Sequence, residues 1–172
     1  MYADDLAIIA KNDTDLKVLL ELAQEHSKRN CYVFNSSKCI IVNSTETHLI
    51  HNVPIPVSKS FSYLGIRFNK SGISSKEQSI ELASRMIRTI PIMKMIGFNF
   101  GFYRPPTNVA IYKTFIRSRG EYGLAILPRP NIKLLQRCQN KAINAALSTS
   151  KSSAQCATHL LTRICKMDVR NF

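Results

Sequence analysis

Two adjacent aspartates lie close to the start of the sequence. Asp4 and Asp5 end the stretch "YADD" and are followed directly by the apolar run "LAIIA". Because neighbouring carboxylates repel each other and no Lys or Arg stands beside them, they are natural ligands for Mg²⁺, a hard cation that binds oxygen. An acidic turn in solvent is the alternative interpretation, and spacing alone does not decide between the two.

Other positions that could serve phosphoryl chemistry are ambiguous when each is taken by itself. Lys38 ends the stretch "FNSSK", where an ordinary turn lysine is the alternative to a lysine beside a phosphate. Tyr63 and Gly65 in "FSYLGIRF" are compatible with ordinary core and bulge positions of a strand. The four histidines share no ligand spacing and the five cysteines lack CxxC spacing, so neither a zinc site nor a disulfide framework is indicated.

The charge of the chain is unevenly distributed. The formal net charge is +13, but residues 1–58 contain five Lys/Arg and seven Asp/Glu, whereas residues 59–172 contain nineteen and four. A strongly basic segment favours a polyanionic partner, because Lys and Arg release counterions when they contact phosphates. A solvated basic surface is the alternative. We therefore expect nucleic acid as the partner of the basic part.

The hydropathy of the chain excludes some locations. No apolar run reaches the roughly 18 to 20 residues of a membrane-spanning helix, and the sequence begins without the basic and hydrophobic regions of a secretory leader. We expect an intracellular protein of the nucleus or cytoplasm, neither bound to a membrane nor secreted. With 45% hydrophobic residues, its 172 residues suffice for one domain, or a small pair, with a buried core.

The first half of the chain predicts one helix and a small sheet. Residues 12–30 have the helical period, with Asn12 or Asp13 as the cap and Asn30 as the left-handed residue that ends the helix. The apolar face of this helix contains Leu16, Leu19, Leu20 and Ala23. Residues 31–68 predict short, antiparallel strands, among which Pro54 and Pro56 fit only an edge or a loop.

Helical periodicity returns after residue 72. We predict a helix that is capped by Ser74 or Ser75, is kinked or ended by Pro91, and has Gly97 as the end of any continuation. Its buried face is expected to contain Ile80, Ala83, Ile87 and Ile90. A third helix over "NVAIYKTFIRSR" has Pro106 near its start and Gly120 just past its end. A fourth covers residues 132–147 and buries Leu135, Cys138, Ala142, Ile143 and Ala146.

Taken together, these segments resemble the reverse transcriptases of non-LTR (LINE-like) retrotransposons. "YADDLAII" is similar to the catalytic YxDD motif of the family with its downstream strand, "FNSSK" to the Asn-x-x-Lys motif, and "YLGIRFNKSG" to the Leu-Gly turn of the primer grip. "VAIYKTFIRSRGEYGLAIL" and "LLQRCQNKAINAAL" look like the thumb. The resemblance covers nearly the whole chain in the expected order.

The resemblance implies an α+β fold. Residues 1–71 would be a partial palm, in which a small antiparallel sheet packs against one helix. Residues 72–150 would be an all-α, basic thumb bundle. Residues 151–172 would be a tail or a weak terminal helix.

The resemblance also implies roles for particular residues. Asp4 would be a metal-binding catalytic carboxylate, Asp5 its neighbour at the metal site, and Lys38 a catalytic general acid near the triphosphate. The primer-grip-like residues would be Tyr63, Leu64 and Gly65. The nucleic-acid-binding residues would be Tyr2, Arg85, Arg88, Lys113, Arg117, Arg119, Arg137 and Lys141.

The implied activity is RNA-directed DNA polymerisation with Mg²⁺ or Mn²⁺ on an RNA template and DNA primer, or an RNA–DNA hybrid. The family's upstream metal-binding aspartate and fingers do not occur in this sequence. We therefore expect a fragment that extends no primer by itself and binds the metal poorly. A further possibility is that it associates with a separate upstream half of the polymerase, which would restore the missing aspartate. The alternative is a basic nucleic-acid-binding module without catalysis.

Overall fold

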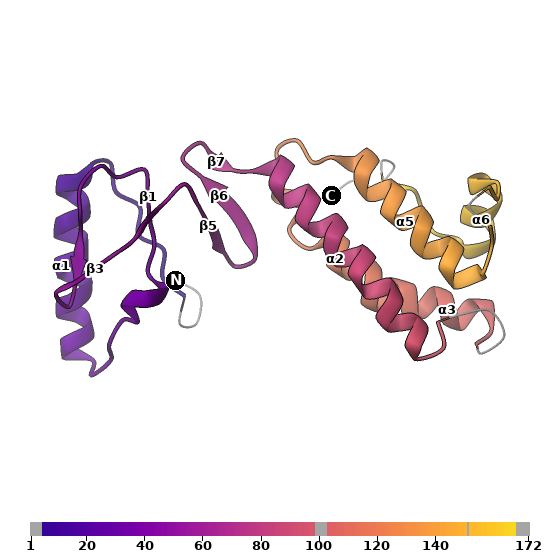
Figure 1. The fold of residues 1–172 in the computed structure, drawn as a ribbon, viewed down its shortest axis with the longest axis horizontal. Coiled ribbons are helices and arrows are strands. Elements are labelled where there is room, and N and C mark those ends of the chain that lie inside the picture. The colour runs from indigo at the N-terminus through magenta and orange to yellow at the C-terminus, as the bar shows by residue number, and fades with distance from the viewer. Residues whose placement is uncertain (1–4, 99–102, 151, 168–172) are drawn as a thin grey trace. The chain divides into compact units, whose positions relative to one another are not determined.

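The chain forms an α+β structure of two compact units, Met1–Ile73 and Ser74–Phe172. The computed structural model describes residues 5–98, 103–150 and 152–167. One helix and all of the described strands belong to the first unit, and the described part of the second unit is helical (Figure 1). No helix in these residues combines the length and hydropathy that a bilayer-spanning segment requires.

Helix α1 (Asp13–Arg29) forms where the sequence predicts it. The Asn12 side chain caps it by accepting the backbone N–H of Asp15 at 2.7 Å. The prediction for the other end is wrong, because Asn30 has a φ of −103° and Cys31 has the positive φ, 56°. Asn30 instead donates its side-chain amide to the carbonyl of His26 at 2.9 Å, which satisfies a carbonyl that the helix end leaves open.

One side of α1 contributes to the core of the first unit. Leu20 is buried with Ile41, Ile50 and Ile55, and Leu16 packs against this cluster. Val18 and Leu22, on the other side of the helix, remain about half exposed. The helix is therefore amphipathic, as predicted, and its apolar stripe fixes it on the strands.

The strands of the first unit form three small sheets, so the prediction of a single antiparallel sheet is wrong. β1 (Ile41–Val42) pairs in parallel with β4 (Val57–Ser58), and β2 (Leu49–Ile50) forms a hairpin with β3 (Val53–Pro54). The stretch "CYVF", expected as a strand, forms none. Short strands with proline in and between them offer few ladder hydrogen bonds, which limits the size of each sheet.

The third sheet contains β5 (Ser60–Tyr63), β6 (Ile66–Asn69) and β7 (Gly72–Ile73), all antiparallel. Leu64 and Gly65 form the two-residue turn between β5 and β6, with φ values of 49° and 76°. The turn replaces the bulge that the residues suggested. Positive φ at both positions is the geometry of a type I′ hairpin turn, which glycine tolerates readily and leucine only under strain.

Helix α2 (Ser75–Met95) begins the second unit and runs through Pro91, which therefore does not end it. The helix stops where Gly97, at a φ of 93°, lets the N–H of Phe98 donate to the Met93 carbonyl at 3.0 Å. Phe98 is fully buried and anchors this end. The predicted role of Gly97 is thus confirmed.

The buried face of α2 matches the predicted one only in part, because Ala83 is buried as predicted but other positions differ. Ile80 is 52% exposed, whereas the polar Gln78 and Ser79 are buried with Leu82 and Met86. The hydroxyl oxygen of Ser79 accepts the backbone N–H of Asn131 at 2.8 Å, so a polar side chain is satisfied in the interior. A hydrogen bond to another part of the chain therefore helps to set the rotation of the helix.

The third predicted helix is a continuous helical stretch with an irregular centre. It consists of α3 (Pro105–Ile111), a π-helical segment (Tyr112–Arg117) and α4 (Ser118–Glu121). Gly120 lies inside α4, not past its end, and the left-handed residue that follows the helix is Gly123, at a φ of 69°. A single 3₁₀ turn, Leu124–Ile126, comes next.

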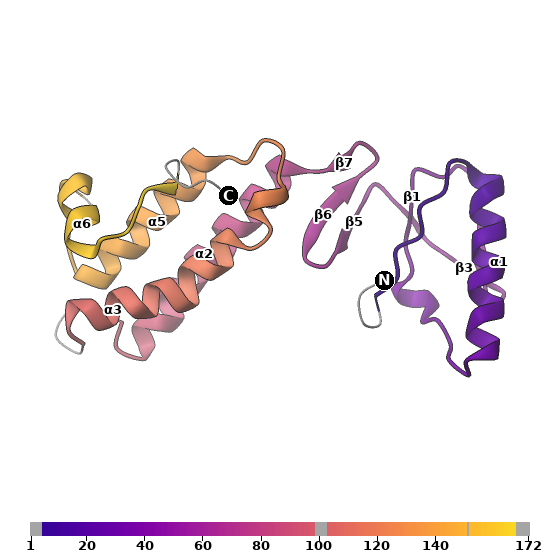
Figure 2. The ribbon, with the colours of Figure 1, turned by 180° about the vertical axis from the view of Figure 1, so that it is seen from behind.

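Helices α5 (Ile132–Leu147) and α6 (Gln155–Thr162) complete the described part of the second unit. The bounds of α5 and its buried face are those predicted, and Asn131 caps it by accepting the N–H of Leu134 at 3.1 Å. α5 packs along α2 and against α3 and α6 (Figures 1 and 2). The second unit is thus a small helical bundle with α2 and α5 at its centre.

Candidate nucleic-acid interface

The "YADD" stretch is only partly visible in the structure. Tyr2 and Asp4 lie outside the described residues. Asp5 is exposed and forms an isolated β-bridge, while residues 6–10 form no strand, contrary to the expected strand after the motif. Within the described ranges, no three His, Cys, Asp or Glu side chains come close enough together to hold a metal ion.

The other predicted palm residues occupy turns of the first unit. Lys38 is exposed at the end of a 3₁₀ turn, Ser36–Lys38, which Asn35 caps by accepting the N–H of Ser37 at 3.1 Å. Tyr63 ends β5, and Leu64 and Gly65 follow as the hairpin turn. In the part of the chain that the structure describes, no hydrogen bond or ion pair joins Asp5 with Lys38.

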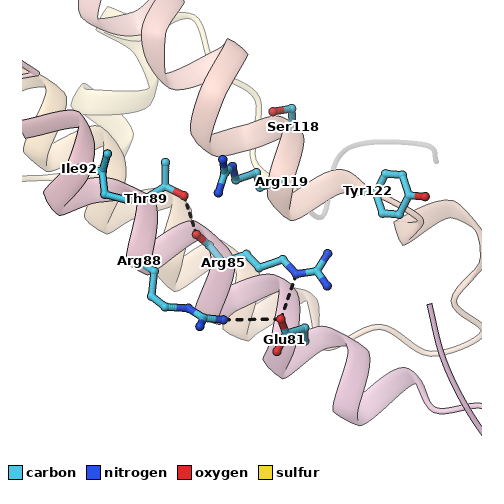
Figure 3. A pocket seen from close by; sticks show the side chains of 8 residues that line it. All are labelled: Glu81, Arg85, Arg88, Thr89, Ile92, Ser118, Arg119 and Tyr122. Atoms are coloured by element: carbon cyan, nitrogen blue, oxygen red, sulfur yellow. Dashed lines mark hydrogen bonds and ion pairs between the residues drawn. The ribbon is translucent and has the colours of Figure 1, made fainter. Parts of the chain in front are cut away.

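Three of the predicted nucleic-acid-binding arginines converge on one groove of the helical unit. The groove has a volume of about 670 Å³ and lies between α2 and the segment that contains α4 (Figure 3). Its lining residues from α2 are Glu81, Arg85, Arg88, Thr89 and Ile92. Those from the facing segment are Ser118, Arg119 and Tyr122. We call this the arginine groove.

Local helix geometry explains why these side chains meet. Glu81, Arg85, Arg88 and Ile92 follow one another at spacings of three and four residues, which places them on one side of α2. Gly120 lets α4 approach α2 closely, since a Cβ at this position would lie 2.3 Å from the Sδ of Met86. The absence of a side chain at Gly120 thus sets how close the two walls of the groove are.

The charges in the arginine groove do not cancel. One carboxylate, that of Glu81, accepts the Nε–H of Arg85 at 3.0 Å and lies 3.6 Å from a terminal nitrogen of Arg88. No carboxylate of the described chain pairs with Arg119. Three guanidinium groups therefore face one carboxylate, and the groove has a net positive charge.

The hydroxyl groups of Thr89 and Ser118 in the groove donate to the backbone. Thr89 donates to the carbonyl of Arg85 at 2.7 Å, and Ser118 donates to the carbonyl of Thr114 at 2.6 Å. The cationic donors that the groove offers to an anion are the guanidinium nitrogens of its arginines. Guanidinium groups bind phosphate and carboxylate oxygens well, because they present several N–H groups in a planar fork.

The remaining predicted contacts are not part of the groove. The Arg117 side chain is only 11% exposed and its Nε donates to Glu121 at 2.8 Å, so Arg117 serves an ion pair along its own helix. Lys113, Arg137 and Lys141 are exposed elsewhere on the helical unit. They can reinforce a positive surface outside the groove.

The lining residues that the sequence did not predict as members of this site are Glu81, Thr89, Ile92, Ser118 and Tyr122. The spacing of Glu81 from Arg85 and Arg88 was a usable signal, because it predicts ion pairs along one helix. Tyr122 gave no such signal, since it lies some thirty residues from the α2 residues with which it shares the groove.

A second polar cluster lies in the first unit and has a structural role. The Nε2 of the buried His48 is 3.0 Å from the Asp13 carboxylate and 3.1 Å from the Ser44 hydroxyl, which itself donates to Asp13. A nucleophilic triad needs the carboxylate and the hydroxyl on different ring nitrogens. Because both contact the same nitrogen here, the cluster fastens the start of α1 to the segment before β2.

This cluster predicts a dependence of stability on pH. Hydrogen bonds from Ser44 and His48 lower the pKa of Asp13 below its ordinary value of 3.8. A lowered folded-state pKa stabilises the fold above the unfolded value, and this contribution is lost as the pH falls through the folded value. Urea unfolding at pH 5 and pH 3 should show a smaller loss of stability on acidification for Asp13→Asn than for the unchanged protein.

The neighbouring acidic residue in the same turn provides the control for this experiment. Asp15→Asn removes a carboxylate from the start of α1 without touching the hydrogen bonds of His48 and Ser44. It should keep the acid sensitivity of the unchanged protein. Equal acid sensitivity of the Asp13→Asn variant and the unchanged protein would contradict the role given to this cluster.

Comparison of the chain with models of known protein families, with characterised proteins and with solved structures gives no match.

Proposed function

We propose that the helical unit of this chain binds nucleic acid and that the arginine groove is the centre of this interface. The observation that carries the proposal is the convergence of Arg85, Arg88 and Arg119, from two helices, against the single carboxylate of Glu81. The helical unit, Ser74–Phe172, contains 16 Lys/Arg and 4 Asp/Glu. A surface of this charge attracts a phosphate backbone by releasing the counterions of the nucleic acid.

Within this proposal, the chain is a fragment of the polymerase domain of a non-LTR reverse transcriptase, from the YxDD motif through the thumb. The order of the "YADD", "FNSSK" and "YLGIRF" stretches supports this proposal, and the Leu64–Gly65 turn is compatible with it. The partner would then be an RNA–DNA hybrid or a template–primer duplex. Mg²⁺ or Mn²⁺ would be the cofactor of an intact parent enzyme, to which Asp4 and Asp5 contribute carboxylates.

A basic nucleic-acid-binding module without catalysis is the second candidate, and the same groove favours it. The two candidates predict different results when the chain is co-expressed with an upstream polymerase half. For the reverse transcriptase fragment, co-expression with such a half should give template-dependent extension that Asp4→Asn abolishes. For the binding module, no extension appears and Asp4→Asn leaves nucleic-acid binding unchanged.

The binding proposal predicts a specific loss of affinity. Arg88→Gln combined with Arg119→Gln should weaken binding to a 20-base-pair RNA–DNA hybrid about tenfold, because two phosphate contacts are lost. The slope of log affinity against log salt should become less steep by about two. Fluorescence anisotropy over a series of salt concentrations measures both quantities.

A control variant with the same change of charge shows whether the loss of affinity comes from the groove or from the lower net charge of the protein. Lys133 and Lys166 are exposed cations of the helical unit that do not line the groove. The variant Lys133→Gln with Lys166→Gln should lose at most a small part of the affinity. An equal loss in both double variants, or binding that salt does not weaken, would refute the assignment of the interface.

A further inference from the structure

The arginine groove is an open recess of about 670 Å³ between two helical walls. Sites of this volume are typical for small molecules and single nucleotide-sized groups. Its lining is also not uniformly charged, because Ile92 and Tyr122 contribute apolar surface beside the arginines.

Tyr122 adds a flat aromatic face at one end of the groove. Its side chain lies at the end where α2 contributes Glu81 and Arg85 (Figure 3). About half of its surface, 52%, is exposed to solvent. Exposed aromatic rings beside cationic side chains are the usual means by which proteins hold unpaired bases, since every base can stack on a ring while cations hold the phosphate.

We infer that the arginine groove holds an unpaired nucleotide of the bound nucleic acid, with its base on Tyr122 and its phosphate against the guanidinium groups. This inference rests on the proposed function and specifies the form of the nucleic acid: a duplex with a single-stranded tail is bound in preference to a blunt duplex. The two walls of the groove supply different cations. Arg119 comes from α4, whereas Arg85 and Arg88 come from α2.

The carboxylate of Glu81 helps to position the cations for this role. Its ion pairs with Arg85 and Arg88 hold these side chains on the groove wall, while Arg119 has no carboxylate partner among the described residues. An incoming phosphate therefore meets one unpaired guanidinium and two that are already oriented. Pre-oriented donors lose less conformational freedom when they bind.

The test compares two forms of one nucleic acid. An RNA–DNA hybrid with blunt ends and the same hybrid with a five-nucleotide single-stranded tail are titrated with the complete chain, and fluorescence anisotropy gives both affinities. The tailed hybrid should bind at least about fivefold more tightly, which is the lower range for stacking of one base. Tyr122→Leu should remove this preference, and Tyr122→Phe should retain it.

A second exposed aromatic residue provides the matched control. Phe115 is 48% exposed on the helical stretch that ends just before Tyr122 but does not line the groove, so Phe115→Leu should leave the preference for the tail unchanged. Equal binding of the two hybrids, or a preference that survives Tyr122→Leu, would overturn the inference while the proposed function stands. Failure to bind either hybrid would overturn the proposed function itself.

Discussion

Replacing Gly120 with alanine is expected to destabilise the helical unit by about 1–3 kcal/mol. Within a helix, alanine is normally the more stable of the two residues, by up to about 1 kcal/mol. Here the new Cβ would lie 2.3 Å from the Sδ and 2.9 Å from the Cγ of Met86, which is fully buried. Because the fully buried Met86 side chain must shift to make room for the new Cβ, we expect overpacking to outweigh the helix preference.

A double-mutant cycle tests the cause of this loss. Met86→Ala removes the atoms that the Cβ would meet, and it should by itself cost about 2–5 kcal/mol as a large-to-small change in the core. Adding Gly120→Ala to Met86→Ala should then cost little or stabilise the protein, so the two losses should be clearly less than additive. Urea unfolding gives the four free energies. Additive losses would contradict a direct contact between α2 and α4 at this point.

The Gly120→Ala variant should also affect binding at the arginine groove. Gly120 lies between Arg119 and Tyr122 along the chain, so a displaced α4 moves both away from the α2 wall. The folded Gly120→Ala variant should therefore also lose part of the preference for a tailed hybrid. Close packing of two helices is thus a condition for the proposed binding site and not only for the core.

Tyr112→Phe is expected to destabilise the helical unit by about 1–3 kcal/mol, although only one oxygen atom is removed. The fully buried Tyr112 donates its hydroxyl to the side-chain oxygen of Gln139 at 3.0 Å, and Gln139 donates its amide to the carbonyl of Cys165 at 3.0 Å. Burial raises the pKa of the Tyr112 phenol, an effect that the charge of Arg117 opposes in part, so the hydroxyl stays protonated and donates. Without it, a buried amide oxygen has lost its donor.

The variant Tyr112→Phe with Gln139→Met provides the comparison for this prediction. Replacing both partners of a buried hydrogen bond by apolar groups costs less than leaving one of them unsatisfied. The loss in the double variant, measured by urea unfolding, should therefore be smaller than the sum of the two single losses. A Tyr112→Phe variant within about 0.5 kcal/mol of the unchanged protein would show that this chain of hydrogen bonds contributes little.

Elements with strong local signals could be predicted from the sequence. Helix α5 has the predicted bounds and the predicted buried face, because its apolar residues recur at helical spacing and Asn131 caps its start. The same holds for the cap and the apolar stripe of α1. In both helices, local preference and the pattern of burial agree, so little depends on distant parts of the chain.

Elements whose geometry depends on distant partners could not be predicted. The rotation of α2, which buries Gln78 and exposes Ile80, depends on packing against α4 and α5 and on a hydrogen bond with Asn131. The parallel pairing of Ile41 with Val57 joins residues sixteen positions apart, between which the chain also forms a separate hairpin. Neither arrangement can be predicted from the spacing of apolar residues along the sequence.

The sequence by itself determined the basic character of the second part of the chain, its helices, and the presence of arginines at helical spacing on α2. Only the tertiary structure decided which of the basic residues act together. Arg119 and Tyr122 become neighbours of Arg85 and Arg88 because α4 packs against α2 at Gly120, whereas Arg117, two residues from Arg119, is held in an ion pair with Glu121. The physical reason is that a groove between two helices is a property of their packing, and the spacing of residues along one helix does not contain it.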